Sequence, residues 1–383
     1  MKAYISNAVL VTPHVKKNGV TVVIENEKII EITSAPLRGE RGSLLIDAAG
    51  LILCPGLIDI HFHGAMGKDT MDANLQSLQL LSSYCAEHGV TTFYPTTWAA
   101  VPEDIMLAIN NVKENQCNVT GARVLGVHIE GPFIDLKYRG AQLQSMIRNP
   151  QAEEFQKWFD SGVVKLITCA PEIPGGMEFI EEAVRKGIRI SVGHSGATYD
   201  QVIEAADHGA TQATHLFNGM QGLHHREPGT VGGVLADERI YPQVISDGVH
   251  LHPGIVKVVI NAKSVDKVIL ITDSIRGAGL PDGDYENKGQ KFSVRAGIAR
   301  TPEGGLSGST LTMDAALRNA MKFTGKPLEE VLSMATSVPA QAMGISANKG
   351  NVVVGGDADL VLLNQELYVE KTLVGGNIVY ERK

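Results

Sequence analysis

Residues 55–64 read PGLIDIHFHG, an apolar run that ends in two histidines one residue apart. Because side chains alternate along a strand, His61 and His63 point to the same face and Phe62 points to the other. Two imidazoles on one face can coordinate a single cation. The HxH pair by itself is weak evidence for a metal site, because two hydrogen-bonded polar residues beside a turn would give the same pattern.

Further apolar runs alternate with amphipathic helical stretches along the middle of the chain. Together with the first run, they lie at 56–63, 90–95, 124–130, 163–170, 188–194, 210–216, 243–247 and 268–273. This alternation predicts parallel βαβ units. Eight units within about 250 to 300 residues fit a (β/α)8 TIM-like barrel. A doubly wound open sheet would alternate in the same way, and the positions of the polar residues favour the barrel.

The two ends of the chain differ from this middle region. Short strand-like runs, such as TVVIE at 21–25 and KIIEIT at 28–33, are separated by Asn and Gly turn signals. The stretch from Gly350 to the end has the same character. We expect antiparallel strands from both termini to form one small discontinuous β-sandwich domain, residues 1–54 with 350–383, flanking a barrel domain of residues 55–349.

The composition excludes several classes of partner. The 383 residues carry 34 Lys+Arg against 42 Asp+Glu, a net charge of −8, and the basic residues are scattered, which argues against nucleic-acid binding. The sequence opens without an apolar leader and contains no 18-residue apolar run, so we expect a cytoplasmic protein with no membrane partner. The four cysteines form no CxxC pair, which argues against a thiolate metal site.

Polar residues stand at the carboxyl ends of five of the predicted strands. Catalytic groups of a (β/α)8 barrel project from these ends, so the side chains should meet there. Imidazole and carboxylate ligands without a thiolate suit Zn²⁺ best, and also Fe²⁺, Co²⁺ or Mn²⁺. The strand-end residues are His61, His63, Glu130, His194, His215 and Asp273.

These residues predict a hydrolytic centre with one or two divalent ions per subunit. Glu130 is placed to bridge an ion held by the HxH pair and a second ion held by His194 and His215. Water bound to such an ion has a pKa of about 7 and becomes a nucleophile at neutral pH. We expect Asp273 to act as the catalytic acid and base, taking the proton of this water and delivering it to a leaving nitrogen.

Several longer motifs carry a family resemblance. Besides PGLIDIHFHG, the chain contains HIEGPF at 128–133, THLFNGM at 214–220, REPG at 226–229, DGVH at 247–250 and TDS at 272–274. With these motifs the chain resembles the N-acetylglucosamine-6-phosphate deacetylases of the amidohydrolase superfamily. The HxH pair and the final Asp are shared by many amidohydrolases, whereas HIEGPF, THLFNGM and REPG together are specific to these deacetylases.

The resemblance implies an activity and a substrate site. The activity is hydrolytic deacetylation of N-acetyl-D-glucosamine 6-phosphate to D-glucosamine 6-phosphate and acetate, in amino sugar catabolism. Asn218, Gly219 and His250 are implied to hold the sugar phosphate. The resemblance also implies a homodimer in which Arg226 reaches the phosphate bound by the neighbouring subunit. An acidic chain needs such donors gathered at one point to hold a dianion.

The chain departs from some members of the family at the HxH pair and at Gln142, and from many other amidohydrolases at Cys169. Both HxH histidines are present where some members carry amides and one metal, which allows two ions. Gln142 stands where some members carry a His that polarises the acetyl carbonyl, and we expect its amide to donate to the developing oxyanion. Cys169 ends strand four where other amidohydrolases have a modified Lys, in agreement with a bridging role for Glu130.

Three alternatives share part of the pattern. A deacetylase for an epimeric N-acetylhexosamine 6-phosphate, such as the galactosamine form, would need the same residues. A cyclic-amide hydrolase or a deaminase would use the same metal ligands without the phosphate donors. A non-catalytic phosphosugar-binding protein would have no use for Asp273. We also expect a structural, hydrogen-bonded role for His128, and a loop and hairpin over residues 277–299 that covers the site.

Overall fold

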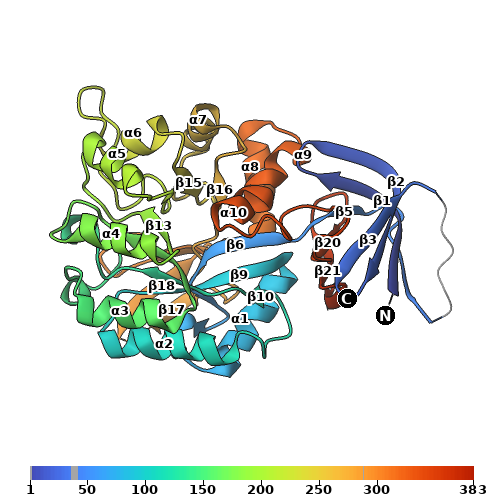
Figure 1. The fold of residues 1–383 in the computed structure, drawn as a ribbon, viewed down its shortest axis with the longest axis horizontal. Helices are drawn as coiled ribbons and strands as arrows, with labels where there is room; N and C mark the ends of the chain where they lie inside the picture. The colour runs from blue at the N-terminus through green and yellow to red at the C-terminus, as the bar shows by residue number, and fades with distance from the viewer. Residues whose placement is uncertain (1, 36–41, 288) are drawn as a thin grey trace.

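The computed structural model describes residues 2–35, 42–287 and 289–383. Its centre is a ring of parallel strands surrounded by helices, with a curled sheet from both chain ends packed beside it (Figure 1). Hydrogen-bonded neighbours follow chain order around the ring. The strands are β6 (Leu57–Phe62), β9 (Val90–Thr97), β11 (Val127–Glu130), β12 (Val164–Cys169), β13 (Arg189–Val192), β14 (Gln212–Ala213), β15 (Tyr241–Val244) and β16 (Ile269–Leu270), and a short strand β10 (Arg123–Val124) also pairs with β9.

The ring closes between its first and last strands. The chain beyond β16 runs beside β6, where the Asp273 N–H donates to the His61 carbonyl over 2.9 Å and the His63 N–H donates to the Ser274 carbonyl over 2.9 Å. Phe62 and Ser274 form a parallel bridge at the same point. The predicted (β/α)8 barrel is therefore confirmed, and closure brings strand-end residues from both extremes of the barrel region together.

A helix lies between each strand and the next, and the predicted amphipathic stretches account for them. Their apolar faces pack against the barrel in one continuous core. The covering helices are α1 (Leu75–Glu87), α2 (Pro102–Asn115), α3 (Ala152–Ser161), α4 (Gly176–Arg185), α5 (Tyr199–Asp207), α6 (Gly229–Ala236), α7 (Pro253–Lys263) and α8 (Met313–Thr324). The short helices α9 (Leu328–Val331) and α10 (Ser337–Ala342) follow, and 3₁₀ turns occur at Thr70–Asp72, Leu136–Tyr138, Gln144–Met146 and Leu332–Ala335.

Both termini contribute to a single eight-stranded sheet. The order is β22 (Asn377–Glu381), β21 (Val369–Val374), β20 (Leu360–Leu363), β5 (Ile52–Pro55), β1 (Lys2–Thr12), β2 (Val15–Glu25) and β3 (Lys28–Thr33), with β4 (Leu44–Asp47) also paired to β1. The expectation of a wholly antiparallel sheet is wrong for β4 and β5, which run parallel to β1. β2 and β3 lie on one side of β1, with β3 at the edge of the sheet, and β4 and β5 lie on the other side of β1.

The terminal sheet encloses a core of its own. Along β20, Leu360 and Leu362 face this core, whereas Val361 and Leu363 face the barrel. The sheet curls until the Ile29 N–H donates to the Gly356 carbonyl just before β20. This closure gives the sandwich-like layer predicted from the termini. The division into residues 1–54 with 350–383 and residues 55–349 stays a prediction.

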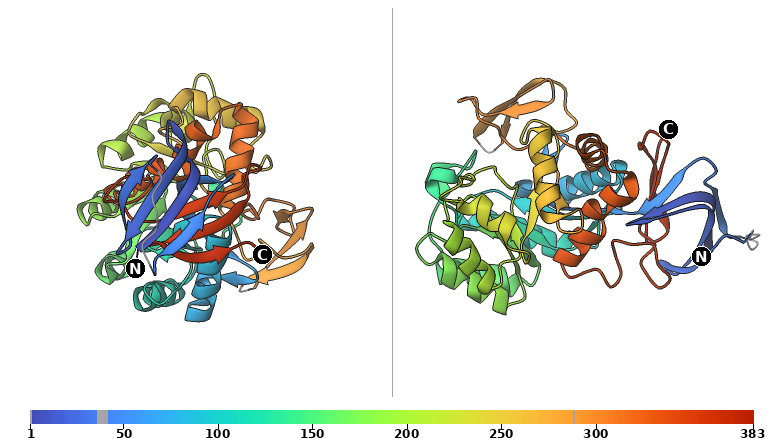
Figure 2. Two further views of the ribbon diagram at one scale, coloured as in Figure 1. Left: turned by 90° about the vertical axis from the view of Figure 1, so that its right-hand side faces the viewer. Right: turned by 90° about the horizontal axis from the view of Figure 1, so that it is seen from above.

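A small three-stranded sheet projects beyond β16. It consists of β17 (Gly283–Asn287), β18 (Gln290–Arg295) and β19 (Ile298–Arg300), and Figure 2 shows it standing out from the barrel. The short strands β7 (Gly64–Ala65) and β8 (Lys68–Asp69) pair nearby. A minor core of Ile275, Phe292, Val294 and Ala299 joins the small sheet to the loop after β16. In the three described ranges, no helix has the length and apolar character to cross a membrane.

Candidate active site

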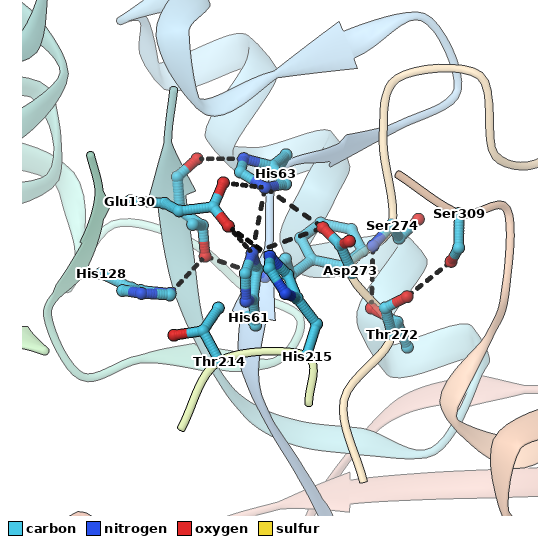
Figure 3. Close-up of polar contacts among 12 residues, drawn as sticks. His61, His63, His128, Glu130, Thr214, His215, Thr272, Asp273, Ser274 and Ser309 are labelled. Atoms are coloured by element: carbon cyan, nitrogen blue, oxygen red, sulfur yellow. Dashed lines mark hydrogen bonds and ion pairs between the residues drawn. The ribbon is translucent and has the colours of Figure 1, made fainter. Parts of the chain in front are cut away.

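The six polar strand-end side chains converge at the carboxyl end of the barrel, and all are buried. Figure 3 shows how His61, His63, Glu130, His215 and Asp273 point toward one another. The Nε2 atoms of His61 and His63 lie 3.1 Å apart, and those of His194 and His215 also lie 3.1 Å apart. Glu130 lies between the two pairs, with Oε1 3.0 Å from His215 Nε2 and 3.4 Å from His61 Nε2.

The side chains divide into two sets of three possible metal ligands. One set is His61, His63 and Asp273, and the other is Glu130, His194 and His215, with the ligand atoms of each set within 4.8 Å of one another. Nitrogen and oxygen ligands placed about 2.1 Å from a tetrahedral ion lie about 3.4 Å from each other. The separations of 3.0 to 3.4 Å match that spacing. The donor set therefore fits a divalent cation in each half.

Three of these residues have a strained backbone. His194, His215 and Asp273 have φ angles of 49°, 29° and 50°. The left-handed region costs a residue with a side chain about 1–2 kcal/mol. Such strain persists where the surrounding structure holds it, and it clusters at functional sites. Each of the three residues follows a barrel strand, and its side chain lines the cavity at the barrel mouth.

Hydrogen bonds to the outer ring nitrogens orient two of the imidazoles. His63 Nδ1 lies 3.2 Å from the Thr96 carbonyl, and His194 Nδ1 lies 2.8 Å from the Tyr138 carbonyl. A carbonyl oxygen only accepts, so Nδ1 carries the proton in both rings. Nε2 of each ring faces the cluster, and a cation that displaces a proton from this atom gains its lone pair as a ligand.

The cluster attracts positive charge. Burial raises the pKa of Glu130, but the His61 imidazole and the other histidines outweigh burial and hold that pKa well below its usual range. Burial lowers the pKa of His63, yet hydrogen bonds to Asp273 and Glu130 outweigh burial and raise it to about 10. Two buried carboxylates need positive partners, and a divalent cation is one that the imidazoles can share.

A cavity of about 260 Å³ opens above the cluster. Asn218, Gly219 and His250 follow β14 and β15 and form a polar wall of this cavity. Trp98 follows β9, on the opposite side of the ring of eight strands, and with Ala141 and Leu306 it makes up the apolar lining, called the apolar wall below. The cavity floor contains Glu130, His194, His215 and Asp273, together with Gln142. A substrate lying across this cavity therefore meets the metal-ligand cluster between a polar end and an apolar end.

The polar wall contains an oriented histidine. His250 Nδ1 lies 2.7 Å from Asp247 Oδ2, so its Nε2 is the free ring nitrogen. Burial lowers the pKa of His250, but the hydrogen bond to Asp247 outweighs burial and the net pKa is raised. An imidazolium at this wall suits an anionic group of a ligand.

Comparison with known proteins shows the family. The model of the amidohydrolase family matches residues 52–379. The chain belongs to the amidohydrolase family. It is 38% identical to N-acetylglucosamine-6-phosphate deacetylase of Bacillus subtilis over 382 residues, which covers 98% of this chain and 96% of the relative. This relative places the chain with the N-acetylglucosamine-6-phosphate deacetylases within that family.

Two further relatives bear on the ligand. N-acetylgalactosamine-6-phosphate deacetylase of Escherichia coli O157:H7 is 36% identical over 330 residues, covering 85% of this chain and 87% of the relative. A solved structure of a mutant N-acetyl-D-glucosamine-6-phosphate deacetylase from Mycobacterium smegmatis, in complex with N-acetyl-D-glucosamine-6-phosphate, is 28% identical. Its TM-score is 0.91, and the match covers 99% of both chains.

In this amidohydrolase, Gln142 is already engaged with the metal-ligand cluster. Its amide nitrogen donates to Glu130 Oε2 over 2.8 Å, and its oxygen accepts from the Ala99 N–H over 2.9 Å. One amide N–H is therefore directed at Glu130, and the second remains for a ligand in the cavity. The predicted contact of Gln142 with a developing oxyanion stays a prediction.

Arg226 lies apart from the other predicted site residues. It is exposed in the loop before α6, its guanidinium contacts His225 Nε2 at 2.8 Å, and it is not among the described residues that line the cavity. Its placement outside its own cavity leaves it available to another subunit. The role across a dimer interface stays a prediction.

Two residues that support the amidohydrolase site, Asp59 and Trp98, were not predicted from the sequence. Asp59 accepts from the His61 N–H over 3.2 Å and from Thr272 Oγ1 over 2.5 Å, and so ties the first strand to the segment that carries Asp273. Trp98 stacks on His63 with ring centroids 4.0 Å apart. The only signals in the sequence were an acidic residue inside the apolar run at 56–63 and an aromatic residue three positions after the run at 90–95.

The structural role predicted for His128 fits its surroundings. It is fully buried beneath the cluster, where its Nδ1 contacts Thr96 Oγ1 at 3.2 Å and its Nε2 contacts Thr168 Oγ1 at 2.8 Å. Its ring packs edge-on against His61 with centroids 4.7 Å apart. Both ring nitrogens are thus used, and His128 supports the His61 ring from below.

Proposed function

We propose that this chain hydrolyses N-acetyl-D-glucosamine 6-phosphate to D-glucosamine 6-phosphate and acetate, as a step of amino sugar catabolism. The observation that carries the proposal is one cavity lined by four residues of the metal-ligand cluster, by polar residues that include an oriented His250, and by apolar residues that include Trp98. A phosphate suits the polar wall, a methyl group suits the apolar wall, and the amide bond lies over the cluster.

The proposal includes a metal centre of one or two divalent ions, with Zn²⁺ as the expected ion and Fe²⁺, Co²⁺ or Mn²⁺ as alternatives. His61, His63 and Asp273 would hold one ion, and Glu130, His194 and His215 the other. When bound, such an ion polarises the acetyl carbonyl and lowers the pKa of a water molecule to about 7. The intact HxH pair supports occupancy of both halves.

In the proposed reaction, Asp273 transfers the proton from the attacking water to the leaving nitrogen. Asp273 lines the cavity and lies 3.3 Å from the Nε2 atoms of both His61 and His63, so its carboxylate reaches the attacking water. In the proposed mechanism it accepts the proton as the water adds to the acetyl carbon. It then returns this proton to the amide nitrogen as the C–N bond breaks, which makes the amine a better leaving group. The second N–H of Gln142 would donate to the carbonyl oxygen during attack.

Phosphate binding would use Asn218, Gly219 and His250 of one subunit and Arg226 of a second subunit in a homodimer. The exposed position of Arg226, outside its own cavity, supports this division. A phosphate dianion does not cross a bilayer unaided, because burying its charge is costly. The proposal therefore places the enzyme in the cytoplasm together with its substrate.

A second candidate is deacetylation of N-acetylgalactosamine 6-phosphate. The relative from Escherichia coli O157:H7 named for that activity is 36% identical to this chain. The two sugars differ at one hydroxyl, so the metal cluster and the phosphate donors would serve both. Discrimination would come from the hydrogen-bonding groups that meet the hydroxyl in the cavity.

The test is acetate release from the glucosamine, galactosamine and mannosamine 6-phosphates, with metal content measured on the same sample. We expect the highest kcat/KM with the glucosamine form, loss of activity after exhaustive chelation, and recovery on adding Zn²⁺. Preference for the galactosamine form would establish the second candidate. Ammonia in place of acetate, or full activity without metal, would overturn the proposal.

A further inference from the structure

Two cavities meet at a wall formed by Trp98 and Ala141. The first is the cavity above the metal-ligand cluster, and the second is a cavity of about 310 Å³ beneath the β17–β19 sheet. Trp98 and Ala141 line both. The second cavity is also lined by residues such as Phe292 and Pro302.

Contacts on several sides hold the Trp98 indole in place. One ring face stacks on His63 with an interplanar angle of 19° and centroids 4.0 Å apart. The indole N–H donates to Asp69 Oδ2 over 3.1 Å, and the same oxygen accepts from Asn287 Nδ2 of β17 over 3.0 Å. Trp98 also packs against the minor core of the small sheet. A ring held in this way is a fixed partition, because any rotation breaks the stack and the hydrogen bond.

In the orientation proposed for the substrate, its acyl group lies against the partition formed by Trp98. The inference rests on the proposed function, in which the phosphate occupies the polar wall at Asn218, Gly219 and His250. The acyl carbonyl must reach the metal-ligand cluster, and Trp98 stacks directly on one of its members. The acyl carbon chain then extends toward Trp98, Ala141 and Leu306, the apolar wall.

We propose that Trp98 sets the length of the N-acyl group that this enzyme removes. With the indole in place, the acyl site ends at the partition and accepts acetyl. With a smaller side chain, the two cavities join, and a longer straight acyl chain enters the space beneath the β17–β19 sheet. The reaction is unchanged: water adds to the acyl carbon, the C–N bond breaks, and the products are the longer carboxylate and glucosamine 6-phosphate.

The test compares N-acetyl, N-butanoyl and N-hexanoyl glucosamine 6-phosphate as substrates of the wild type, Trp98→Ala and Trp98→Leu. Detection of the released primary amine gives the same readout for every acyl length. Each excluded methylene is worth about 10- to 200-fold in kcat/KM. For the wild type, we expect kcat/KM to fall steeply when the acyl group is longer than acetyl. In both variants, the butanoyl-to-acetyl ratio of kcat/KM should rise about tenfold or more.

Matched controls separate the wall from a general disturbance. Trp158, the other tryptophan of the chain, is fully buried in α3 and is not among the described residues that line either cavity, so Trp158→Phe should leave the acyl ratio unchanged. Metal content of each variant shows whether loss of the stack on His63 has emptied the site. Trp98→Leu keeps an apolar contact with the minor core and serves if Trp98→Ala does not fold.

The outcomes distinguish the two proposals. If the wild type releases no amine from the N-acetyl substrate, the proposed function fails. If it does so and both metal-loaded Trp98 variants keep the wild-type acyl ratio, Trp98 does not set acyl length and only this inference is overturned. A raised ratio in Trp158→Phe would also overturn it, because the effect would not be specific to the wall.

Discussion

Replacing Gly219 by Ala should weaken metal binding, although Gly219 itself is not a metal ligand. Gly219 has φ 58°, and a Cβ built there would lie 2.8 Å from both His194 Nδ1 and the Tyr138 carbonyl oxygen. These two atoms are the partners of the 2.8 Å hydrogen bond that orients His194. The new methyl group therefore presses on both partners at once, and neither is the free end of a flexible chain.

Two costs determine the size of the effect. The left-handed backbone at residue 219 costs a residue with a side chain about 1–2 kcal/mol, which lowers the free energy of unfolding. Loss of the hydrogen bond that orients a metal-ligating imidazole typically lowers metal affinity by about 10- to 100-fold. We expect the Kd of the ion at Glu130, His194 and His215 to rise by that factor.

The assay is a competition titration of the metal-free protein with a chelator of known affinity. Gly222→Ala is the matched control, because Gly222 lies in the same loop and a Cβ there meets nothing within 4 Å. Gly222→Ala should keep the wild-type Kd. Equal affinities for the wild type and Gly219→Ala would refute the argument that the close approach at Gly219 preserves the His194 orientation.

Three further outcomes follow from the site. Asp273→Asn should lower kcat by about 10²- to 10⁴-fold, while metal analysis still finds an ion at the other ligand set; near-normal turnover would remove Asp273 from the mechanism. The pKa of His250 is raised, so its positive charge is present below that raised pKa, and KM for the phosphorylated substrate should increase as the pH rises through it. Asp247→Asn should move this increase to lower pH, and an unshifted profile would exclude the pair from phosphate binding. Arg226→Ala should raise KM without lowering metal content, and mixing it with an Asp273→Asn partner should restore part of the substrate affinity if the arginine acts across a dimer.

The barrel was predictable because its signal is local and repeated. Each strand reads as a short apolar run, each helix as an amphipathic stretch, and the polar residues fall at the strand ends. The expected strand at 268–273 is shorter in the structure, where β16 ends at Leu270. Asp273 has a left-handed φ of 50°, and that kink ends the regular strand geometry. The apolar run at 268–273 does not predict this kink, because an apolar pattern does not specify the φ angle of a single residue.

The supports of the site were not predictable in the same way. Trp98 reads as one aromatic residue after a strand, and nothing in the sequence pairs it with His63 or Asp69. Gln142 was assigned to the substrate, yet one of its N–H groups points to Glu130 because Ala99 of another loop holds its oxygen. Such partners lie 12 to 43 residues apart in the chain, and loop conformation decides whether they meet.

The sequence by itself determined the order of strands and helices, the face to which each strand residue points, and the polar groups at the strand ends. It could do so because side-chain alternation and apolar periodicity are properties of residues that are neighbours in the chain. Only the tertiary structure decided that His61 and Asp273, 212 positions apart, lie 3.3 Å from each other, and that Trp98 separates two cavities. The physical reason is closure of the barrel: hydrogen bonds between the first strand and the segment after the last one bring these residues together, and loop packing then sets the remaining distances.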